Sequence, residues 1–401
     1  DLDPSVRATD RNGSVRAAFV SFLDELAAAD GRSVLALASD IRTGLPGGAD
    51  EREGGDGAVA FLVGPGRPGA PVLAEPLGWA SATGEFLDRW RTPGEAHSQV
   101  WEERFGEFAY LPLADAAFSA ALKRAGVTPA DLDHLVVAGP HSRAVRSFAS
   151  GSGARREALA DDLTGAVGNL GAAHFGLVLA SVLDRAEPGQ LVGVVSVADG
   201  ADALVLRTTA ELPSYRRRGG FDATVEAAVA SGRPGLSYTQ FLTWREMLRR
   251  EPPRRPDPDR PAAPPSLRSE EWKFAFVGSR CTARVGGAEC GMRHLPPQRV
   301  CARCHAVDQM APQPFADARA TVATFTVDRL AYSPSPPIVA AVLDFDGGGR
   351  FRCELTDVDA DKVAIGDRVE MTFRRLYTAK GVHDYFWKAR PVRTAGERKE
   401  A

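Results

Sequence analysis

The sequence predicts an α/β layered domain, followed by a small cysteine-rich ribbon and a small all-β barrel. Three observations predict this order. Apolar patterns typical of helices alternate with short buried-strand patterns over residues 1–209. Four of the five cysteines fall within one stretch of 24 residues, 281–304. From residue 318 onward, short strand patterns are separated by glycine-rich or polar turns.

The first part of the chain supplies the layered domain. The predicted helices span residues 14–29, 113–125 and 171–185. We expect the second helix to begin after Pro112, because a proline just ahead of the first turn forfeits no helical hydrogen bond. The predicted strands span residues 33–39, 57–64, 134–138, 191–197 and 203–208. All five are apolar enough to be read as buried strands, and we take the first two as neighbours in one buried sheet.

A linker separates this domain from the rest. Residues 210–270 contain a helical pattern around 238–250 and then the run EPPRRPDPDRPAAPPS. That run is not expected to form a regular helix or a central strand, because proline lacks the backbone donor and fixes φ. The predicted domains are a layered domain at 1–209, a helical and Pro-rich linker at 210–270, a ribbon at 271–312, a barrel at 313–395 and a tail at 396–401.

The clustered cysteines have the spacing Cys-x8-Cys-x10-Cys-x2-Cys. Thiolates in such a pattern can close a tetrahedral zinc site, and four of them leave no open position for a substrate. We therefore predict a structural zinc bound by Cys281, Cys290, Cys301 and Cys304. Each pair of cysteines, Cys281 with Cys290 and Cys301 with Cys304, is expected to form one metal-binding loop, or knuckle, and the first knuckle is longer than usual. Two alternatives therefore remain open: the four cysteines are unrelated core thiols, or His294 or His305 replaces Cys281 as a zinc ligand. Cys353 lies in an apolar strand pattern and is predicted to be a buried core residue.

The C-terminal strands point to a barrel of the oligonucleotide/oligosaccharide-binding (OB) type. Their sequences are ATVATFTVDRL, IVAAVLDF, RFRCELT, DRVEMTFRRLY and DYFWKARPV. Cations and aromatics suited to nucleic acid are present at Arg374, Arg375, Tyr377, Tyr385 and Trp387. The acidic run at residues 357–361 and the net charge of −3 oppose such binding, so no nucleic-acid partner is expected.

Other features of the sequence indicate in which cellular compartment the protein is found. No run of about 18 apolar residues is present, so no membrane span is expected. We recognise no signal peptide, and the cysteines are spaced as for metal binding rather than for disulfides. These features predict a protein of the reducing cytoplasm.

The C-terminal third resembles a known family of proteins. The segments WKFAFVGSRC and CGMRHLPPQRVCARC, followed by GDRVEMTF and YFWKARPV, are similar to the rubredoxin-like zinc-ribbon and OB-fold proteins that accompany thiolases and other acyl-CoA enzymes. The similarity covers residues 272–392. It implies an accessory module that handles the acyl or CoA part of a substrate, or that bridges partner enzymes.

The N-terminal part resembles the thiolase superfamily, nearest to 3-hydroxy-3-methylglutaryl-CoA synthase and ketoacyl synthase III. The matching segments are DGRSVLALASD, EGGDGAVAFLVG, VWEERFGEFAY, GNLGAAHFGLVLASVLDRAEPGQ and SVADGADA. The resemblance implies a layered fold of two similar halves, of which this chain holds the second and only the end of the first. It also implies acyl-CoA or acyl-carrier-protein thioesters as substrates, and a homodimer or a complex with another thiolase-like subunit.

The resemblance carries over to three candidate site residues. The family's nucleophilic cysteine aligns with Asp10, which implies either an acid/base or a helix N-cap in a dead site. The catalytic histidine aligns with Ala138, and His141 three residues later is a proton shuttle or a surface-loop residue. The family's asparagine aligns with Asn169, an oxyanion donor, a cap of the following helix, or both. Asp199 and Asp202 follow a strand, and we favour turn roles for them.

Two functions follow from these residues. The first is an acyltransferase-, synthase- or aldolase-like enzyme that makes or breaks a carbon–carbon bond in an acyl thioester without a cysteine nucleophile. Proton transfer and enolate stabilisation need no covalent acyl-enzyme. The alternative is a noncatalytic thiolase-like scaffold that binds the thioester and supports an active subunit. Convergence of Asp10, His141 and Asn169 on one pocket would separate the two functions.

Overall fold

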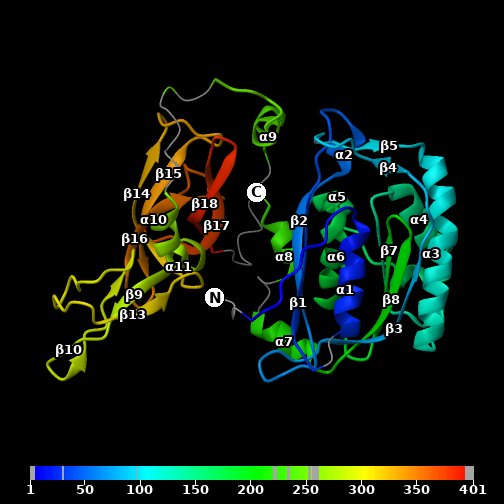
Figure 1. The fold of residues 1–401 in the computed structure, drawn as a ribbon, viewed down its shortest axis with the longest axis horizontal. Helices are drawn as coiled ribbons and strands as arrows, with labels where there is room; N and C mark the ends of the chain where they lie inside the picture. Colours follow the sequence, from blue (N-terminus) through cyan, green and yellow to red (C-terminus); the bar gives the residue numbers. More distant parts are fainter. Residues whose placement is uncertain are drawn as a thin grey trace. The chain divides into compact units, whose positions relative to one another are not determined.

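The computed structural model describes residues 5–28, 31–95, 97–219, 224–232, 235–251, 254 and 262–392. Most of the Pro-rich run and the predicted tail at 396–401 lie outside these residues. The chain divides into two compact units, one within residues 8–232 and one within residues 233–394 (Figure 1).

The first unit alternates helices and strands, as predicted. Its helices are α1 (Arg16–Ala28), α2 (Ala49–Glu53), α3 (Glu103–Ala125), α4 (Ser142–Gly151), α5 (Thr164–Val167), α6 (His174–Leu183), α7 (Leu212–Gly219) and α8 (Val225–Ala230), with 3-10 turns η1 (Pro129–Asp131), η2 (Arg156–Ala158) and η3 (Gly171–Ala173). Its strands are β1 (Val34–Ile41), β2 (Asp56–Val63), β3 (Ala74–Ala82), β4 (Arg89–Trp90), β5 (Gln99–Val100), β6 (His134–Ala138), β7 (Leu191–Val197) and β8 (Ala201–Thr208).

A four-stranded sheet forms the centre of this unit, in the order β3-β8-β7-β6. Strands β6 and β7 are parallel, and the other pairs are antiparallel. Helices α3 and α4 cover one face, where Tyr110, Phe118 and Phe148 are buried. Helices α1 and α6 cover the other face, as Figure 1 shows. Because both faces are covered, the central strands are apolar almost throughout, as predicted for β6, β7 and β8.

Strands β1 and β2 pair antiparallel in a separate two-stranded sheet. Their inner face packs on α1 and α6; the Phe22 and Phe61 rings lie 5.1 Å apart. The outer face carries four exposed aliphatic side chains: Leu35, Leu37, Ile41 and Leu62. The pairing was predicted, but the expectation of a fully buried sheet was wrong. Burial alternates along each strand, because no described layer of this unit covers the outer face.

Helix α3 is longer than predicted. It begins at Glu103, so Pro112 lies inside it rather than ahead of it. A proline within a helix removes one backbone donor. Pro112 is exposed, and water can therefore hydrogen-bond the carbonyl that loses its helical partner. The buried side of the helix continues across this point through Tyr110, Ala114 and Phe118.

The second unit contains the ribbon and the barrel. Its helices are α9 (Tyr238–Trp244), α10 (Ala263–Arg268) and α11 (Glu270–Ala275). Its strands are β9 (Val277–Cys281), β10 (Arg284–Val285), β11 (Ala288–Glu289), β12 (Arg293–His294), β13 (Met310–Pro314), β14 (Ala320–Asp328), β15 (Ile338–Phe345), β16 (Arg350–Leu355), β17 (Arg368–Ala379) and β18 (Val382–Pro391). Helix α10 begins within the Pro-rich run, which was not expected to be helical. Its prolines lie in the first turn, where their missing N–H groups break no helical bond.

The predicted barrel is confirmed. Strands β14 to β18 form a closed barrel in the order β14-β15-β16-β18-β17, and each coincides with one of the five predicted strand sequences. Aromatic rings pack in its core: Phe276 stacks on Trp387 with ring centroids 5.3 Å apart and meets Phe351 edge-on at 5.4 Å. The ribbon is a three-stranded sheet, β12-β9-β13, with a β10-β11 hairpin. None of the helices within the described residues is both long and apolar enough to span a membrane.

Candidate functional site

The four clustered cysteines converge in the ribbon. Their Sγ atoms all lie within 4.8 Å of one another, with Cys281 and Cys304 3.6 Å apart and Cys290 and Cys301 3.8 Å apart. Zinc–sulfur bonds of about 2.3 Å in a tetrahedron place the sulfurs about 3.8 Å apart, which matches these distances. The cysteines are free thiols, and His294 and His305 do not belong to the converging group. The donor set could therefore hold a zinc ion with Cys281 as a member.

The thiols differ in how easily they ionise. Burial raises the pKa of Cys281 to about 12. Burial also opposes ionisation of Cys301, but hydrogen bonds from the backbone N–H groups of Cys304 and Arg303, together with those of the His294 and Cys304 side chains, lower its pKa to about 5. The Arg303 guanidinium donates to the Cys290 carbonyl at 3.2 Å and so braces the second knuckle against the first. This local support is of the kind that orients metal ligands.

Asn169 connects two segments of the first unit. Its Nδ2 donates to the Gly139 carbonyl at 2.7 Å, and its Oδ1 accepts the Gly171 N–H at 2.9 Å. Its backbone bridges to the end of α2, because Asn169 N–H donates to Glu53 O and Gly55 N–H donates to Asn169 O at 3.0 Å. The side chain thus caps η3 and fixes the loop after β6. One of its two amide hydrogens takes part in none of the described hydrogen bonds and is available, as an oxyanion donor requires.

His141 is buried, contrary to the surface-loop alternative, with 8% of its surface exposed. It is the N-cap of α4, where its Nδ1 accepts the Ala144 N–H at 3.0 Å. The proton of the neutral ring therefore lies on Nε2, which has no hydrogen-bond partner among the described residues. This nitrogen faces Gly106 of α3, where any Cβ would collide with it. The ring also lies 5.9 Å from the Tyr110 ring.

Asp10 makes no described contact with Asn169 or His141. It is exposed and sits in a non-helical segment, and α1 begins only at Arg16. The N-cap alternative for Asp10 is therefore wrong, because the carboxylate is six residues ahead of the first helical residue. Among the described contacts, Asn169 reaches the loop that leads to His141, through Gly139, whereas no described contact joins Asp10 to either residue.

Sequence reasoning missed a buried ion pair at the start of α1. The Arg16 guanidinium donates to both Asp202 oxygens, at 2.8 and 3.1 Å, and to the Asp199 carbonyl at 2.9 Å. Asp202 is fully buried and lies on strand β8, so its predicted turn role is wrong. Asp199 does occupy a turn, with φ of 49°. A lone aspartate within the apolar run of β8 was the available signal, since buried carboxylates require a partner.

A second missed residue lies beside Asn169. Asp40 of β1 accepts the Ala172 N–H at 3.1 Å, so its carboxylate caps the same turn that Asn169 caps. The alternation along β1 places Asp40 on the inner face with Ala36 and Ala38. A carboxylate on the apolar face of an alternating strand could have been found from the sequence.

The two barrel arginines that could suit nucleic acid, Arg374 and Arg375, are already paired with carboxylates. Arg374 pairs with Asp357 at 3.0 Å, and Arg375 pairs with Glu246 at 3.1 Å. The Trp387 indole N–H donates to the Lys273 carbonyl at 2.9 Å. The cations and this aromatic therefore already have partners within the unit.

Comparison with known proteins supports both halves of the resemblance. Residues 313–374 match the family described as the ChsH2 C-terminal OB-fold domain. The hydroxymethylglutaryl-CoA synthase of Aeropyrum pernix is 29% identical over 168 residues, which are 42% of this chain and 46% of that protein. The synthase of Methanopyrus kandleri is 28% identical over 218 residues, or 54% and 60% of the two chains.

This chain therefore spans about half the length of the curated relatives it matches. A solved structure described as an Ltp2-ChsH2(DUF35) aldolase is 22% identical, with a TM-score of 0.25, over 34% of this chain and 98% of that one. The N-terminal part is thiolase-like, of the hydroxymethylglutaryl-CoA synthase kind, and the C-terminal part carries a ChsH2-type OB-fold domain with a four-cysteine cluster.

Proposed function

We propose that this chain, thiolase-like in its N-terminal part, acts on acyl-CoA or acyl-carrier-protein thioesters and makes or breaks a carbon–carbon bond without a cysteine nucleophile. The observation that carries the proposal is the geometry of Asn169. Its amide is fixed by contacts to Gly139 and Gly171, and one N–H remains for a thioester oxygen. Similarity to synthases whose name includes a CoA thioester supports this substrate class.

The proposed reaction is an aldol addition or its reverse. In the cleavage direction, a base removes the proton of a β-hydroxyl group, and the bond between Cα and Cβ breaks. A carbonyl product leaves, and the electron pair moves into the thioester as an enolate, which is then protonated at Cα. The Asn169 N–H would stabilise the enolate oxygen. No acyl group is transferred to the protein, so Asp10 in place of cysteine is compatible with this chemistry.

The proton-transfer roles are assigned to Asp10 as acid/base and to His141 as proton shuttle. Asp10 is exposed and therefore accessible to a bound substrate. His141 would have to change its contacts, because its Nδ1 is occupied by the Ala144 N–H and its Nε2 faces α3. Asp10 is thus the better test of the proposal.

The test combines native mass spectrometry with product analysis, using a panel of acyl-CoAs that includes β-hydroxyacyl-CoAs. We expect binding and turnover by the wild type, and loss of at least a hundredfold in turnover for Asp10→Asn with binding retained. Asn169→Ala should lower turnover more than binding. Asp115→Asn is the matched control, because Asp115 is also exposed and lies on the outside of α3. Equal turnover by Asp10→Asn and Asp115→Asn would contradict the role of Asp10.

The second candidate is a noncatalytic scaffold that binds the thioester for an active partner. The observation that favours it is the position of His141, buried as a helix cap and without a described contact to Asp10 or Asn169. Binding of acyl-CoA without product formation, or activity only after addition of a second thiolase-like subunit, would establish this function.

Three further assignments complete the proposal. Zinc is the metal proposed for the four cysteines, in a structural role. A homodimer or a complex with another thiolase-like subunit is proposed to cover the apolar outer face of β1 and β2, where Leu37 is 70% exposed. A cytoplasmic location is proposed because the thiols must stay reduced to bind zinc.

A further inference from the structure

We propose that a groove in the barrel wall binds a small amphipathic molecule with a single carboxylate, its apolar body on the groove floor and its carboxylate on Arg352. The site belongs to the second unit and does not depend on the function proposed for the thiolase-like part.

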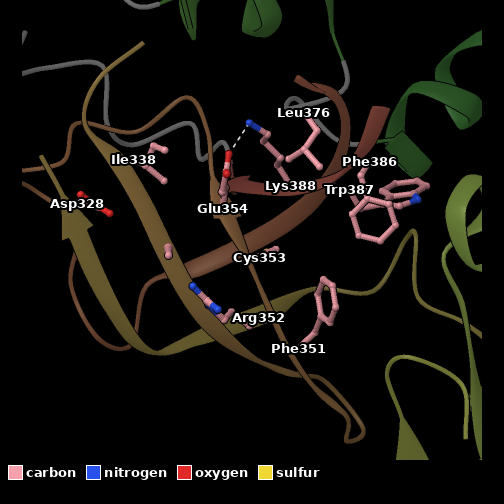
Figure 2. A pocket seen from close by; sticks show the side chains of 11 residues that line it. Asp328, Ile338, Phe351, Arg352, Cys353, Glu354, Leu376, Phe386, Trp387 and Lys388 are labelled. Atoms are coloured by element: carbon pink, nitrogen blue, oxygen red, sulfur yellow. Dashed lines mark hydrogen bonds and ion pairs between the residues drawn. The ribbon is translucent and has the colours of Figure 1, made fainter. Parts of the chain in front are cut away.

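The groove opens where two barrel strands diverge. Strands β16 and β18 form a parallel pair at Leu355 and Ala389, and Figure 2 shows the side chains that line the opening beside this point. Its cavity is about 410 Å³, within the range of about 300–1,000 Å³ typical of small-molecule sites. A second hollow of about 200 Å³ adjoins it, and Asp328, Ala340 and Arg352 line both.

The floor of the groove is apolar. Phe351, Leu376, Phe386 and Trp387 lie on one side of the opening in Figure 2, and Ile338 lies on the other. The indole N–H of Trp387 is already bonded to the Lys273 carbonyl, so the ring offers this cavity an apolar surface. Such a floor favours a hydrocarbon chain or ring over a polar ligand.

Of the four charged side chains around the groove, three are already satisfied. Lys388 pairs with Glu354 at 2.6 Å, as the dashed line in Figure 2 marks. The Asp328 carboxylate accepts the N–H groups of Leu330 at 2.8 Å and Ala331 at 2.9 Å. The Arg352 guanidinium makes no hydrogen bond or ion pair with any residue that the structure describes, and the residue is exposed at the cavity wall.

This charge arrangement selects the ligand. A free guanidinium presents paired donors that match a carboxylate in two parallel hydrogen bonds. A phosphate could use the same donors, but the four groups sum to zero charge, and a dianion would place a second negative charge near Glu354 and Asp328. A single carboxylate instead balances Arg352 alone. The geometry therefore favours a monocarboxylate with an apolar body of moderate length.

Isothermal titration of the full chain with octanoate tests the site. Octanamide, which has the same length but no charge, and octyl phosphate are the comparison ligands. We expect octanoate to bind one site, and Arg352→Gln to raise its Kd by about ten- to a hundredfold. Octanamide should bind the wild type as weakly as octanoate binds Arg352→Gln. Arg350→Gln is the matched control, because Arg350 lies two residues away on the same face of β16 but is already paired with Asp344 at 2.6 Å.

A second variant tests the cavity rather than the charge. Ala340→Leu places a larger side chain at the wall shared by the two hollows and should weaken octanoate binding while Arg352 is intact. Thermal melting of each variant checks that the barrel remains folded. Absence of octanoate binding, or equal Kd values for Arg352→Gln and Arg350→Gln, would overturn the proposal. Tighter binding of octyl phosphate than of octanoate would overturn the choice of a carboxylate.

Discussion

The two sheets of the thiolase-like unit contrast in how they are covered. The four-stranded sheet has α3 and α4 on one face and α1 and α6 on the other, and residues such as Leu204 of β8 are 1% exposed. The β1-β2 sheet shares α1 and α6 as its inner cover, but its outer face exposes Leu37 at 70%. Both sheets are made of strands rich in aliphatic residues.

The contrast shows that an apolar strand does not by itself create a core. The free energy of burial comes from area removed from water, at about 25 cal/mol per Å², and it is gained only where a second layer lies against the strand. The outer face of β1 and β2 therefore remains available for a further layer, whether a second copy or another subunit supplies it. The predictions below test this dependence on covering layers, from the largest expected effect to the smallest.

The ribbon extends the comparison to a sheet with almost no core. Its buried cluster consists of Cys281, Ala283 and Cys301, with a few partly buried neighbours. If zinc replaces the missing core, a strong chelator should unfold residues 271–312 and loosen the barrel, because zinc contributes about 10–16 kcal/mol to the folding of comparable small sites. Hydrogen exchange followed by mass spectrometry should show this change while the β3-β8-β7-β6 sheet stays protected. Unchanged exchange in the ribbon would contradict a structural metal.

The Arg16–Asp202 pair tests the layer of helices α1 and α6 that lies between the two sheets. The pair ties the start of α1 to strand β8. Asp202→Asn should destabilise the first unit by about 3–5 kcal/mol, because it leaves the Arg16 guanidinium without its countercharge. Urea unfolding measures the change. Asp24→Asn is the control: the Arg11–Asp24 pair is about half exposed, so a loss of less than about 1 kcal/mol is expected. Similar losses for the two variants would refute the anchoring role of Asp202.

A pair of leucine truncations tests the two sheets directly. Leu204→Ala should cost about 2–5 kcal/mol, because it opens a cavity between β8 and the helices α1 and α6. Leu37→Ala should change the isolated chain by less than about 0.5 kcal/mol. Urea unfolding of both variants at low protein concentration supplies the measurement. A loss above 1 kcal/mol for Leu37→Ala that grows with protein concentration would mean that the outer face is covered in an assembly.

His174 of helix α6 is expected to make the stability of the first unit depend on pH. Burial lowers the pKa of His174, whose side chain lies on α6 between the two sheets and is 2% exposed. Below about pH 6.5 the unfolded chain takes up a proton that the folded chain does not, so stability falls as the pH falls, by up to about 1.4 kcal/mol per pH unit. Comparing urea unfolding at pH 7.5 and 5.5 for the wild type and His174→Gln isolates this effect. An equal pH slope in both proteins would assign the acid sensitivity to other groups.

The four-cysteine cluster and the barrel were the most predictable parts. Ligand spacing is local in sequence, so the convergence of Cys281, Cys290, Cys301 and Cys304 followed from their types and separations. The barrel strands alternate with clear turns, and each of the five predicted strand sequences forms a strand of the barrel. The candidate site was less predictable. Alignment located Asn169, but only the structure showed that it holds Gly139, and that His141 caps α4 instead of standing in an open loop.

The sequence by itself indicated helices α1 and α6, strands β1, β2, β6, β7 and β8 and the five barrel strands, but not strand β3 or helix α4. It also indicated which cysteines gather and which broad class of protein each part resembles. These properties depend on periodicity, residue type and spacing, all of which are local. Only the tertiary structure decided that Asp202 is paired with Arg16, that one face of β1 and β2 is exposed, and that Arg352 borders a cavity without a partner. Those outcomes depend on which distant segments meet, because burial and pairing are properties of contacts rather than of single residues.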